Sequence, residues 1–165
     1  MDGVSKKQAE IAAAWWAERI SSPSPKNHDN GDHTLNGALC MSLGLMLAEK
    51  NRPTAEQVAK FRERLAEILV NGGSYTIPGY ERTTIHLDGG TEKEFIPAKT
   101  VDMYPRLGLW TDYAPGIILC AAAEYAGIGP SVFPIKTGMQ FEENDRVTAS
   151  LGYGADWVEV EEKLP

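Results

Sequence analysis

The sequence has few of the features that would assign it to a membrane, to an oxidising compartment or to a class of small scaffold. It contains only two cysteines, Cys40 and Cys120, which are too few for a disulfide framework. Its longest apolar run extends only from Ala38 to Ala48, whereas a membrane-spanning helix needs about 20 apolar residues. The opening stretch MDGVSKKQAE has no apolar core of the kind found in signal peptides. We therefore expect a cytoplasmic protein with two reduced cysteines and no membrane partner.

Signatures of nucleotide-binding enzymes and hydrolases are also missing. No G-x-x-x-x-G-K-[ST] loop and no G-x-S-x-G elbow occurs, which argues against P-loop NTPases and α/β-hydrolases. The glycines of GYGADW, residues 152–157, are not followed by the helical pattern that a dinucleotide fingerprint requires. These absences favour a protein without a cofactor, and they make a non-enzymatic role the simpler expectation.

Positive charge is scarce, and the negative charge is unevenly placed. The chain has 16 Lys and Arg against 23 Asp and Glu, for a net charge of −7. Residues 141–165 alone have a net charge of −5, since only Arg146 and Lys163 oppose the carboxylates Glu142, Glu143, Asp145, Asp156, Glu159, Glu161 and Glu162. Such a segment repels phosphate backbones, so direct nucleic-acid binding is not expected. It favours either a basic protein partner or simply a solubilising face.

The first half of the chain predicts helices. A chain of 165 residues with 42% hydrophobic content is long enough to bury one core. Apolar residues recur at helical spacing over Lys6 to Ile20 and over about Leu35 to Lys50. A third helix is expected to follow a capping box at Thr54 and to stop at Asn71-Gly72-Gly73. The second helix is apolar nearly all round, which predicts a central place in the core.

The second half predicts strands with one inserted helix. RTTIHLDGGTEKEFIP reads as a hairpin because Asp88-Gly89-Gly90 suits a tight turn, and a fourth helix is expected over about Pro115 to Tyr125, with Asp112 near its start. Three further strands are expected at Ile135–Phe141, Arg146–Leu151 and Trp157–Glu162. The predicted fold is a single α+β domain: helices over about residues 1–73, packed on a mostly antiparallel sheet of about five strands from the rest of the chain.

The stretch NHDNGDH, residues 27–33, is the densest group of metal-ligating side-chain types in the chain. Its candidate metal ligands are His28, Asp29, Asp32 and His33. An EF-hand loop does not fit, because with Gly31 at the sixth position the twelfth position is Gly37 rather than glutamate. A zinc site would require the loop to fold back over the next helix so that Cys40 completes the ligand set.

The same residues also suit a turn. Asn30-Gly31 can form the turn itself, and Asp32 or Thr34 can cap the helix that follows. This interpretation is the preferred one, because it uses the polar side chains for backbone hydrogen bonds and needs no ligand from elsewhere.

A cysteine amidase or hydrolase is a further candidate, with Cys40 as nucleophile and His86 as base in the chain order of papain-like enzymes. Cys40 falls inside an apolar helix between Leu39 and Met41, where a buried and unreactive thiol is expected. His86 alternates with polar residues of the hairpin, so an exposed strand histidine is the alternative. The pattern therefore gives little support to catalysis.

The C-terminal strands combine carboxylates with aromatic residues. Trp157, Glu159 and Glu161 alternate, so they share one face of a strand. An aromatic anchor flanked by carboxylates suits a cationic partner, especially arginine. The candidate binding residues are Trp157, Glu159, Glu161, Glu162, Tyr153 and Asp145. A solvated outer face with one locally packed tryptophan is the alternative.

Four motifs resemble a group of small proteins encoded by bacteriophages and prophages, largely of gut bacteria. They are AWWAERI, NHDNGDHTLNG, LWTDYAPGIILCAAAEYAGI and VTASLGYGADWVEV, which together span most of the chain. The resemblance implies an accessory phage protein that acts in the cytoplasm of the bacterial host. Such proteins often inhibit host defence, and they include anti-CRISPR proteins that occupy the positively charged nucleic-acid channels of effector nucleases.

The leading expectation is thus a non-enzymatic acidic inhibitor of a basic host defence protein, such as a CRISPR effector nuclease. An alternative is a small-molecule binder for a nucleotide signal, built from helix N-termini near Thr34 and Asp112 with Trp110, Tyr104 and Tyr113. The cysteine hydrolase is the third possibility. A homodimer is also open, because adjacent tryptophans such as Trp15 and Trp16 suit an interface as well as a core.

Overall fold

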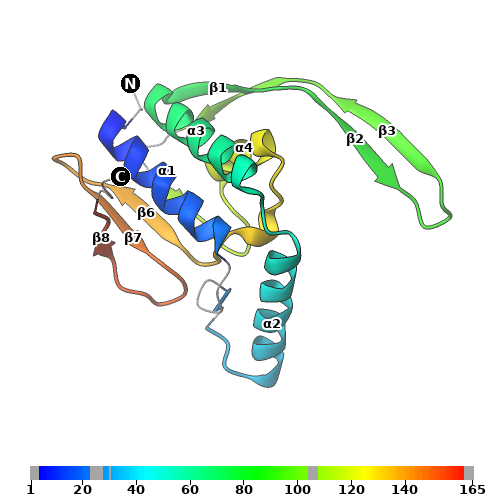
Figure 1. The fold of residues 1–165 in the computed structure, drawn as a ribbon, viewed down its shortest axis with the longest axis horizontal. Helices are drawn as coiled ribbons and strands as arrows, with labels where there is room; N and C mark the ends of the chain where they lie inside the picture. Colours follow the sequence, from blue (N-terminus) through cyan, green and yellow to red (C-terminus); the bar gives the residue numbers. More distant parts are fainter. Residues whose placement is uncertain (1–3, 23–27, 30, 104–107, 162–165) are drawn as a thin grey trace.

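A computed structural model describes residues 4–22, 28, 29, 31–103 and 108–161. The chain adopts the predicted α+β fold (Figure 1). Its helices are α1 (Lys6–Ser21), α2 (Leu35–Lys50), α3 (Ala55–Asn71) and α4 (Ile117–Ala126), followed by the short 3-10 helix η3 (Pro130–Val132). All four α-helices were expected close to these bounds.

Side-chain caps fix the starts of the first three helices. Ser5 and Gln8 form a capping box on α1, and Thr54 and Gln57 form the predicted one on α3. Thr34 caps α2 by accepting a hydrogen bond from the backbone N–H of Gly37. Each cap satisfies backbone donors that have no partner within the helix, so these boundaries follow from local chemistry.

The described residues contain more strands than the expected five, arranged in three antiparallel sheets. Their bounds are β1 (Gly73–Ile77), β2 (Tyr80–Ile85), β3 (Thr91–Ile96), β4 (Lys99–Met103), β5 (Leu109–Trp110), β6 (Gly138–Phe141), β7 (Val147–Ser150) and β8 (Val158–Glu159). The expected strands at 135–141 and 157–162 are thus shorter in the structure. β5, β6, β7 and β8 form one sheet in that order, called here the four-stranded sheet.

β1 to β4 form one long two-stranded ribbon. β1 pairs with β4 and β2 pairs with β3 in a single continuous register, and pairing is interrupted near Pro78 and Pro97, which have no backbone N–H to donate. The predicted hairpin turn lies at its tip, where Gly89 has a φ of 86°. The ribbon projects from the body of the molecule as an arm (Figure 1).

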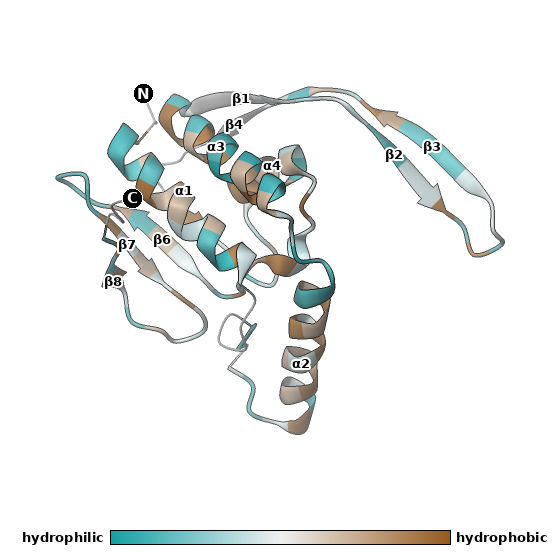
Figure 2. Cartoon of the chain, viewed as in Figure 1, coloured by the Kyte–Doolittle hydropathy of each residue, from teal (hydrophilic) through white to brown (hydrophobic). Residues whose placement is uncertain are grey.

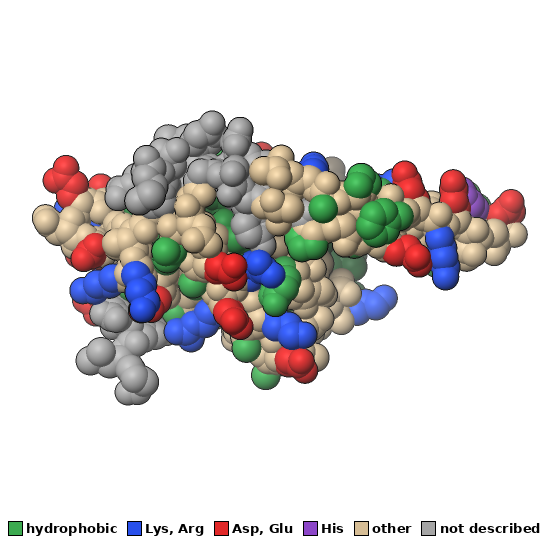
Figure 3. Space-filling view, turned by 90° about the horizontal axis from the view of Figure 1, so that it is seen from above, with side chains coloured by type: hydrophobic (Ala, Val, Ile, Leu, Met, Phe, Trp, Pro, Cys, Tyr) green, Lys and Arg blue, Asp and Glu red, His purple; other side chains and the backbone are tan. Residues whose placement is uncertain are grey.

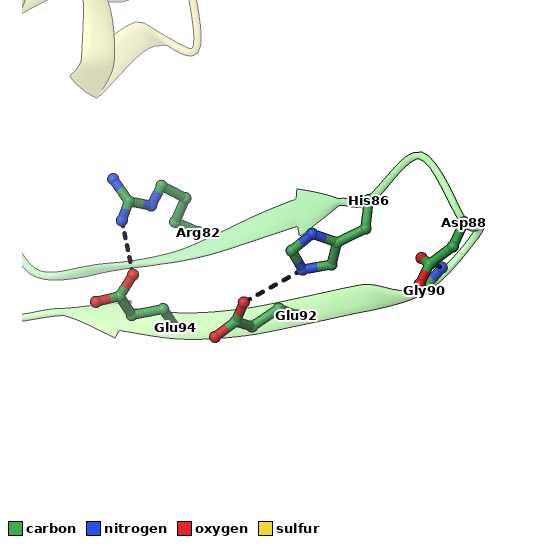
Figure 4. Close-up of polar contacts among 6 residues, drawn as sticks. All are labelled: Arg82, His86, Asp88, Gly90, Glu92 and Glu94. Atoms are coloured by element: carbon green, nitrogen blue, oxygen red, sulfur yellow. Dashed lines mark hydrogen bonds and ion pairs between the residues drawn. The ribbon is translucent and has the colours of Figure 1, made fainter.

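The outer half of the arm is held by ion pairs across the two strands. Arg82 contacts Glu94 at 2.6 Å, and His86 lies 3.3 Å from Glu92 (Figure 4). Lys93 lies 3.8 Å from Glu81 on the other face. Acidic and basic side chains therefore alternate along the arm (Figure 3), which leaves no single-sign surface there for nucleic acid.

The core lies between α1, α3, α4 and the inner face of the four-stranded sheet. Trp16 of α1 and Phe61 of α3 are fully buried, and both rings contact Phe133, at centroid distances of 6.3 and 5.7 Å. The sheet contributes Leu109, Met139, Val147 and Ala149 to the same core. Trp16 is therefore a core residue, and its neighbour Trp15 packs at the edge of the core.

The prediction that α2 is central in the core is wrong. α2 projects from the body and packs mainly against η3 (Figures 1 and 2). Leu39, Leu43 and Met46 are each at least half exposed. The apolar composition of α2 indicates that its surface favours burial. Composition does not tell whether the same chain or another molecule buries that surface.

Candidate functional site

The outer face of the four-stranded sheet carries two tryptophans in one row. Trp110 of β5 pairs with Gly138 of β6, and Gly138 pairs with Ser150 of β7. Val158 pairs with Ala149, so the preceding residue Trp157 lies opposite Ser150. Paired residues of antiparallel strands point to the same side, which places both tryptophans on the face opposite the core.

A glycine between the tryptophans makes room for one of them. A side-chain Cβ at Gly138 would come within 2.9 Å of Cη2 of Trp157, so the indole ring lies over the bare backbone of β6. Trp110 is 49% exposed and Trp157 is 50% exposed. The sheet thus presents two large aromatic surfaces on a rigid scaffold rather than on mobile loops.

Carboxylates lie on the same face of the sheet as these rings. Gln140, Thr148 and Glu159 form the next row of the same face, and Glu159 is exposed. Glu142 accepts a hydrogen bond from the hydroxyl of Thr148 at 3.4 Å, which holds a second carboxylate on the same side. Trp110, Gly138, Gln140, Thr148, Trp157 and Glu159, with Glu142, are called the outer-face site.

Not every predicted binding residue belongs to this site. Glu161 lies past the end of β8, where it lines a small hollow with Ile11 and Trp15 of α1. Asp145 occupies the exposed turn between β6 and β7 with a φ of 60°. The position of Glu162 lies outside the described residues. Trp157 and Glu159 are therefore the predicted residues that the sheet brings together, and Trp110 joins them from a distant segment.

The β6–β7 turn is anchored to the first helix. Gln8 of α1 is buried, and its side-chain amide donates to the carbonyl oxygens of Glu142 and Arg146 at 2.8 and 3.0 Å. This contact holds the acidic turn at one end of the outer-face site. Gln8 was not a candidate, because a glutamine at a helix start gives no sequence signal beyond its capping role.

A polar cluster flanks the sheet next to Trp110. Asp112 forms an ion pair with Lys136, whose Nζ lies 4.6 Å from the centroid of the Tyr113 ring. The hydrogen bond to the Asp112 carboxylate raises the pKa of Lys136. Asp112 precedes α4, as expected, and the N-cap of α4 is Gly116, which makes no side-chain cap hydrogen bond.

The described residues of NHDNGDH support a turn and a helix cap, whereas Asn30 of the expected Asn30-Gly31 turn lies outside the described residues. Gly31 has a φ of 76°, and its N–H donates to the carboxylate of Asp29 at 2.9 Å. Asp32 accepts from the N–H of Thr34 at 2.9 Å, and hydrogen bonding by Thr34 lowers the pKa of that carboxyl. Among the residues that the structure describes, no cluster of His, Cys, Asp and Glu is arranged to hold a metal ion.

Tyr153 connects this loop to the sheet. A Cβ at Gly31 would lie 2.4 Å from the Tyr153 ring, so the ring packs directly on the glycine backbone. Tyr153 remains 60% exposed. The predicted binding residue Tyr153 thus lies beside the loop rather than on the outer face.

His28 has a structural position in the same loop. It is 4% exposed, and its Nε2 has no hydrogen-bond partner. Its ring lies beside Gly44, where a Cβ would be 3.5 Å from Nδ1, so His28 supports α2. Burial lowers the pKa of His28 below the ordinary value of 6.5.

We expect this histidine to make folding pH-dependent. As pH falls below 6.5, the unfolded chain takes up a proton that folded His28 resists, so stability declines toward the lower folded pKa. The slope is at most about 1.4 kcal/mol per pH unit. Urea unfolding at several pH values between neutral and mildly acidic measures how the free energy of unfolding changes with pH. His28→Gln should flatten the dependence, and equal slopes in wild type and His28→Gln would contradict the assignment.

The two cysteines do not form a catalytic pair with His86. Cys40 is exposed on α2 rather than buried as expected, and His86 lies near the tip of the arm, in a different projection from the body (Figure 1). Cys120 is half-buried in α4, and its thiol donates to the carbonyl oxygen of Pro115 at 3.3 Å. Burial raises the pKa of Cys120, which disfavours the nucleophilic thiolate.

Two adjoining cavities lie away from the outer-face site. One of about 370 Å³ opens between the base of the arm and α4, lined by Pro78, Gly79, Tyr80, Ala121, Glu124 and Tyr125. An adjoining one of about 220 Å³ includes Cys120 and Lys99. Neither is lined by Thr34, Asp112, Trp110 or Tyr113, and Tyr104 lies outside the described residues. The predicted nucleotide pocket is therefore not assembled at these cavities.

Comparison with known proteins adds no family or function. No family model matches the chain, and the searches of curated proteins and of solved structures gave no match. No helix in the described part of the chain has the length and apolar character needed to cross a membrane.

Proposed function

We propose that the protein is a non-enzymatic inhibitor that binds a basic surface of a host protein through the outer-face site. The observation that carries the proposal is the pair of half-exposed tryptophans that flank Gly138 on the sheet, with the carboxylates of Glu159 and Glu142 on the same face. Tryptophan is enriched among residues that dominate protein-binding energy, because it buries a large rigid surface.

The chemistry of the site favours a partner that presents arginine or lysine. Indole faces attract guanidinium groups, and nearby carboxylates accept hydrogen bonds from them. The net charge of −7 also attracts a basic protein over longer distances and accelerates association. A polyanionic ligand such as nucleic acid would be repelled by the same carboxylates.

The class of partner that fits is a nucleic-acid-processing enzyme. Its substrate channel is basic by necessity, so an acidic protein with aromatic anchors can occupy it in place of the nucleic acid. The motifs AWWAERI and VTASLGYGADWVEV, which resemble phage-encoded accessory proteins, support a defence nuclease such as a CRISPR effector.

Charge reversal tests this proposal. The purified protein is used to capture partners from bacterial lysate at low and moderate salt, with mass spectrometry of the retained proteins. We expect one basic protein that is released as salt rises. Glu159→Lys combined with Glu142→Lys should reduce its capture by at least tenfold, about 1.4 kcal/mol.

Glu63→Lys combined with Glu67→Lys is the matched control, because it makes the same charge change on α3, away from the outer face. Loss of capture in both double variants would indicate a dependence on net charge alone. Unchanged capture in the Glu159 and Glu142 variant would contradict the outer-face site. A thermal shift with a nucleotide, combined with an empty column, would favour the small-molecule alternative.

A further inference from the structure

α2 carries an exposed apolar stripe that no other described part of the chain covers. The stripe consists of Leu35 (86% exposed), Leu39 (57%), Leu43 (50%), Met46 (64%) and Leu47 (51%). At about 100° per residue, these positions fall within an arc of about 120° on the helix surface. They form a continuous seam along the helix, of the width at which helices pack against each other.

The opposite side of α2 is the side used by its own chain. Ala48 is fully buried, Gly44 faces the His28 ring, and Gly37 lies against Asp32, where a Cβ would meet the backbone oxygen at 2.1 Å. These small residues lie about half a turn away from the stripe. The fold therefore fixes α2 by one face and leaves the leucine face exposed. Figure 2 shows the many hydrophobic residues of this projecting helix.

The charge distribution selects the kind of partner. From Leu35 to Ala48 the helix has no charged residue, although the chain as a whole is strongly acidic. A neutral leucine seam offers nothing to a charged peptide. It also lacks the strongly charged polar face of helices that lie on membranes. α2 is instead a surface on which two copies of an acidic chain can approach without charge repulsion.

We propose that α2 pairs antiparallel with α2 of a second copy about a two-fold axis near Ser42 and Leu43. Such an interface is self-complementary, so each leucine seam covers the other. Lys50, at the C-terminal end of the seam, then lies at the N-terminal end of the other helix, near its Asp32 carboxylate. The helix dipoles oppose each other in this arrangement, which is also favourable.

The area of the seam suits a weak dimer. A helix of 16 residues is about 24 Å long and about 10 Å wide, which gives about 750 Å² of lateral surface. The seam spans about a third of the helix circumference, so two copies bury about 500 Å² in total through α2. That area lies in the range of weak, transient interfaces, and it predicts a dimer that dissociates on dilution.

The dimer would present two outer-face sites in one particle. Two linked sites bind more tightly than one site when the target has two copies of the recognised surface, or when two target molecules lie side by side. Dimerisation and partner binding use different surfaces, so each can fail independently of the other.

Sedimentation velocity over a concentration series tests the proposal. We expect a monomer–dimer equilibrium in the wild type. Leu39→Glu combined with Leu43→Glu should raise the dimer dissociation constant by at least tenfold, since four carboxylates would then meet in the interface. Leu87→Glu is the control, because Leu87 is fully exposed at the tip of the arm. The Leu87→Glu variant should dimerise as the wild type does.

Cross-linking through Cys40 gives a second test that does not depend on a destabilising substitution. With helices about 9 Å apart, the antiparallel geometry places the two Cys40 Cα atoms about 11 Å apart, within reach of a short bismaleimide. A Cys120→Ala protein should form a covalent dimer, and a protein with Cys40→Ala in addition should not. A protein that sediments as a monomer at all concentrations and forms no covalent dimer would overturn the proposal. A dimer that the α2 substitutions leave unchanged would also overturn it.

Discussion

Phe61→Ala is expected to lower the free energy of unfolding by about 3–5 kcal/mol. Phe61 is fully buried in α3, and its ring packs edge-on against Phe133 at 5.7 Å, so truncation removes both apolar burial and an aromatic contact. Helices α1, α3 and the segment after α4 meet at this point, which leaves little freedom for the cavity to collapse. Urea denaturation monitored by circular dichroism measures the change.

Phe95→Ala is the control for this substitution. Phe95 lies on β3 of the arm and is 68% exposed, so the same chemical change should alter stability by no more than about 0.5 kcal/mol. Comparable losses at Phe61 and Phe95 would mean that the arm folds back onto the body in solution. A small loss at Phe61 would contradict the assignment of the core.

Trp110→Ala combined with Trp157→Ala is expected to weaken partner binding by at least about 30-fold, or about 2 kcal/mol. Both rings are already half exposed, so their removal costs much less in folding stability than in binding. Calorimetry or surface plasmon resonance with the captured partner measures the dissociation constant, and circular dichroism confirms that the sheet remains folded.

Gly138→Val tests whether binding depends on where the Trp157 ring lies and not only on the presence of a tryptophan. A Cβ at residue 138 would lie 2.9 Å from the indole, so valine must displace the ring while both tryptophans remain in the chain. We expect weaker binding in this variant and unchanged binding in Phe95→Ala, which also removes an exposed aromatic ring. Wild-type affinity in the double tryptophan variant would exclude the outer-face site as the binding surface.

Local chemistry in the sequence predicts the helices well. The bounds of α2 agree with the expected range, and Thr54 with Gln57 forms the expected capping box, because caps and apolar spacing depend on neighbouring residues only. The hairpin turn at Asp88-Gly89-Gly90 follows for the same reason. Strand ends were less predictable: β8 stops at Glu159 rather than Glu162, since pairing depends on what the partner strand offers.

The candidate site was only half predictable. Trp157 and Glu159 alternate on one short segment, so their shared face is visible in the sequence. Trp110 and Gly138 come from distant segments, and only the register of β5 with β6 and of β6 with β7 brings them beside Trp157. Gly138, a glycine inside a predicted strand, is the signal that could have indicated a close approach of another side chain to that strand.

By itself, the sequence determined the element types, the acidic C-terminal segment and the turn chemistry of NHDNGDH, because each depends on residues close together in the chain. Only the tertiary structure decided that α2 lies outside the core, that Cys40 is separated from His86, and that two tryptophans share a sheet face. Apolar periodicity indicates which face of an element favours burial. Which part of the structure packs on that face is decided by long-range packing, within the chain or with another copy.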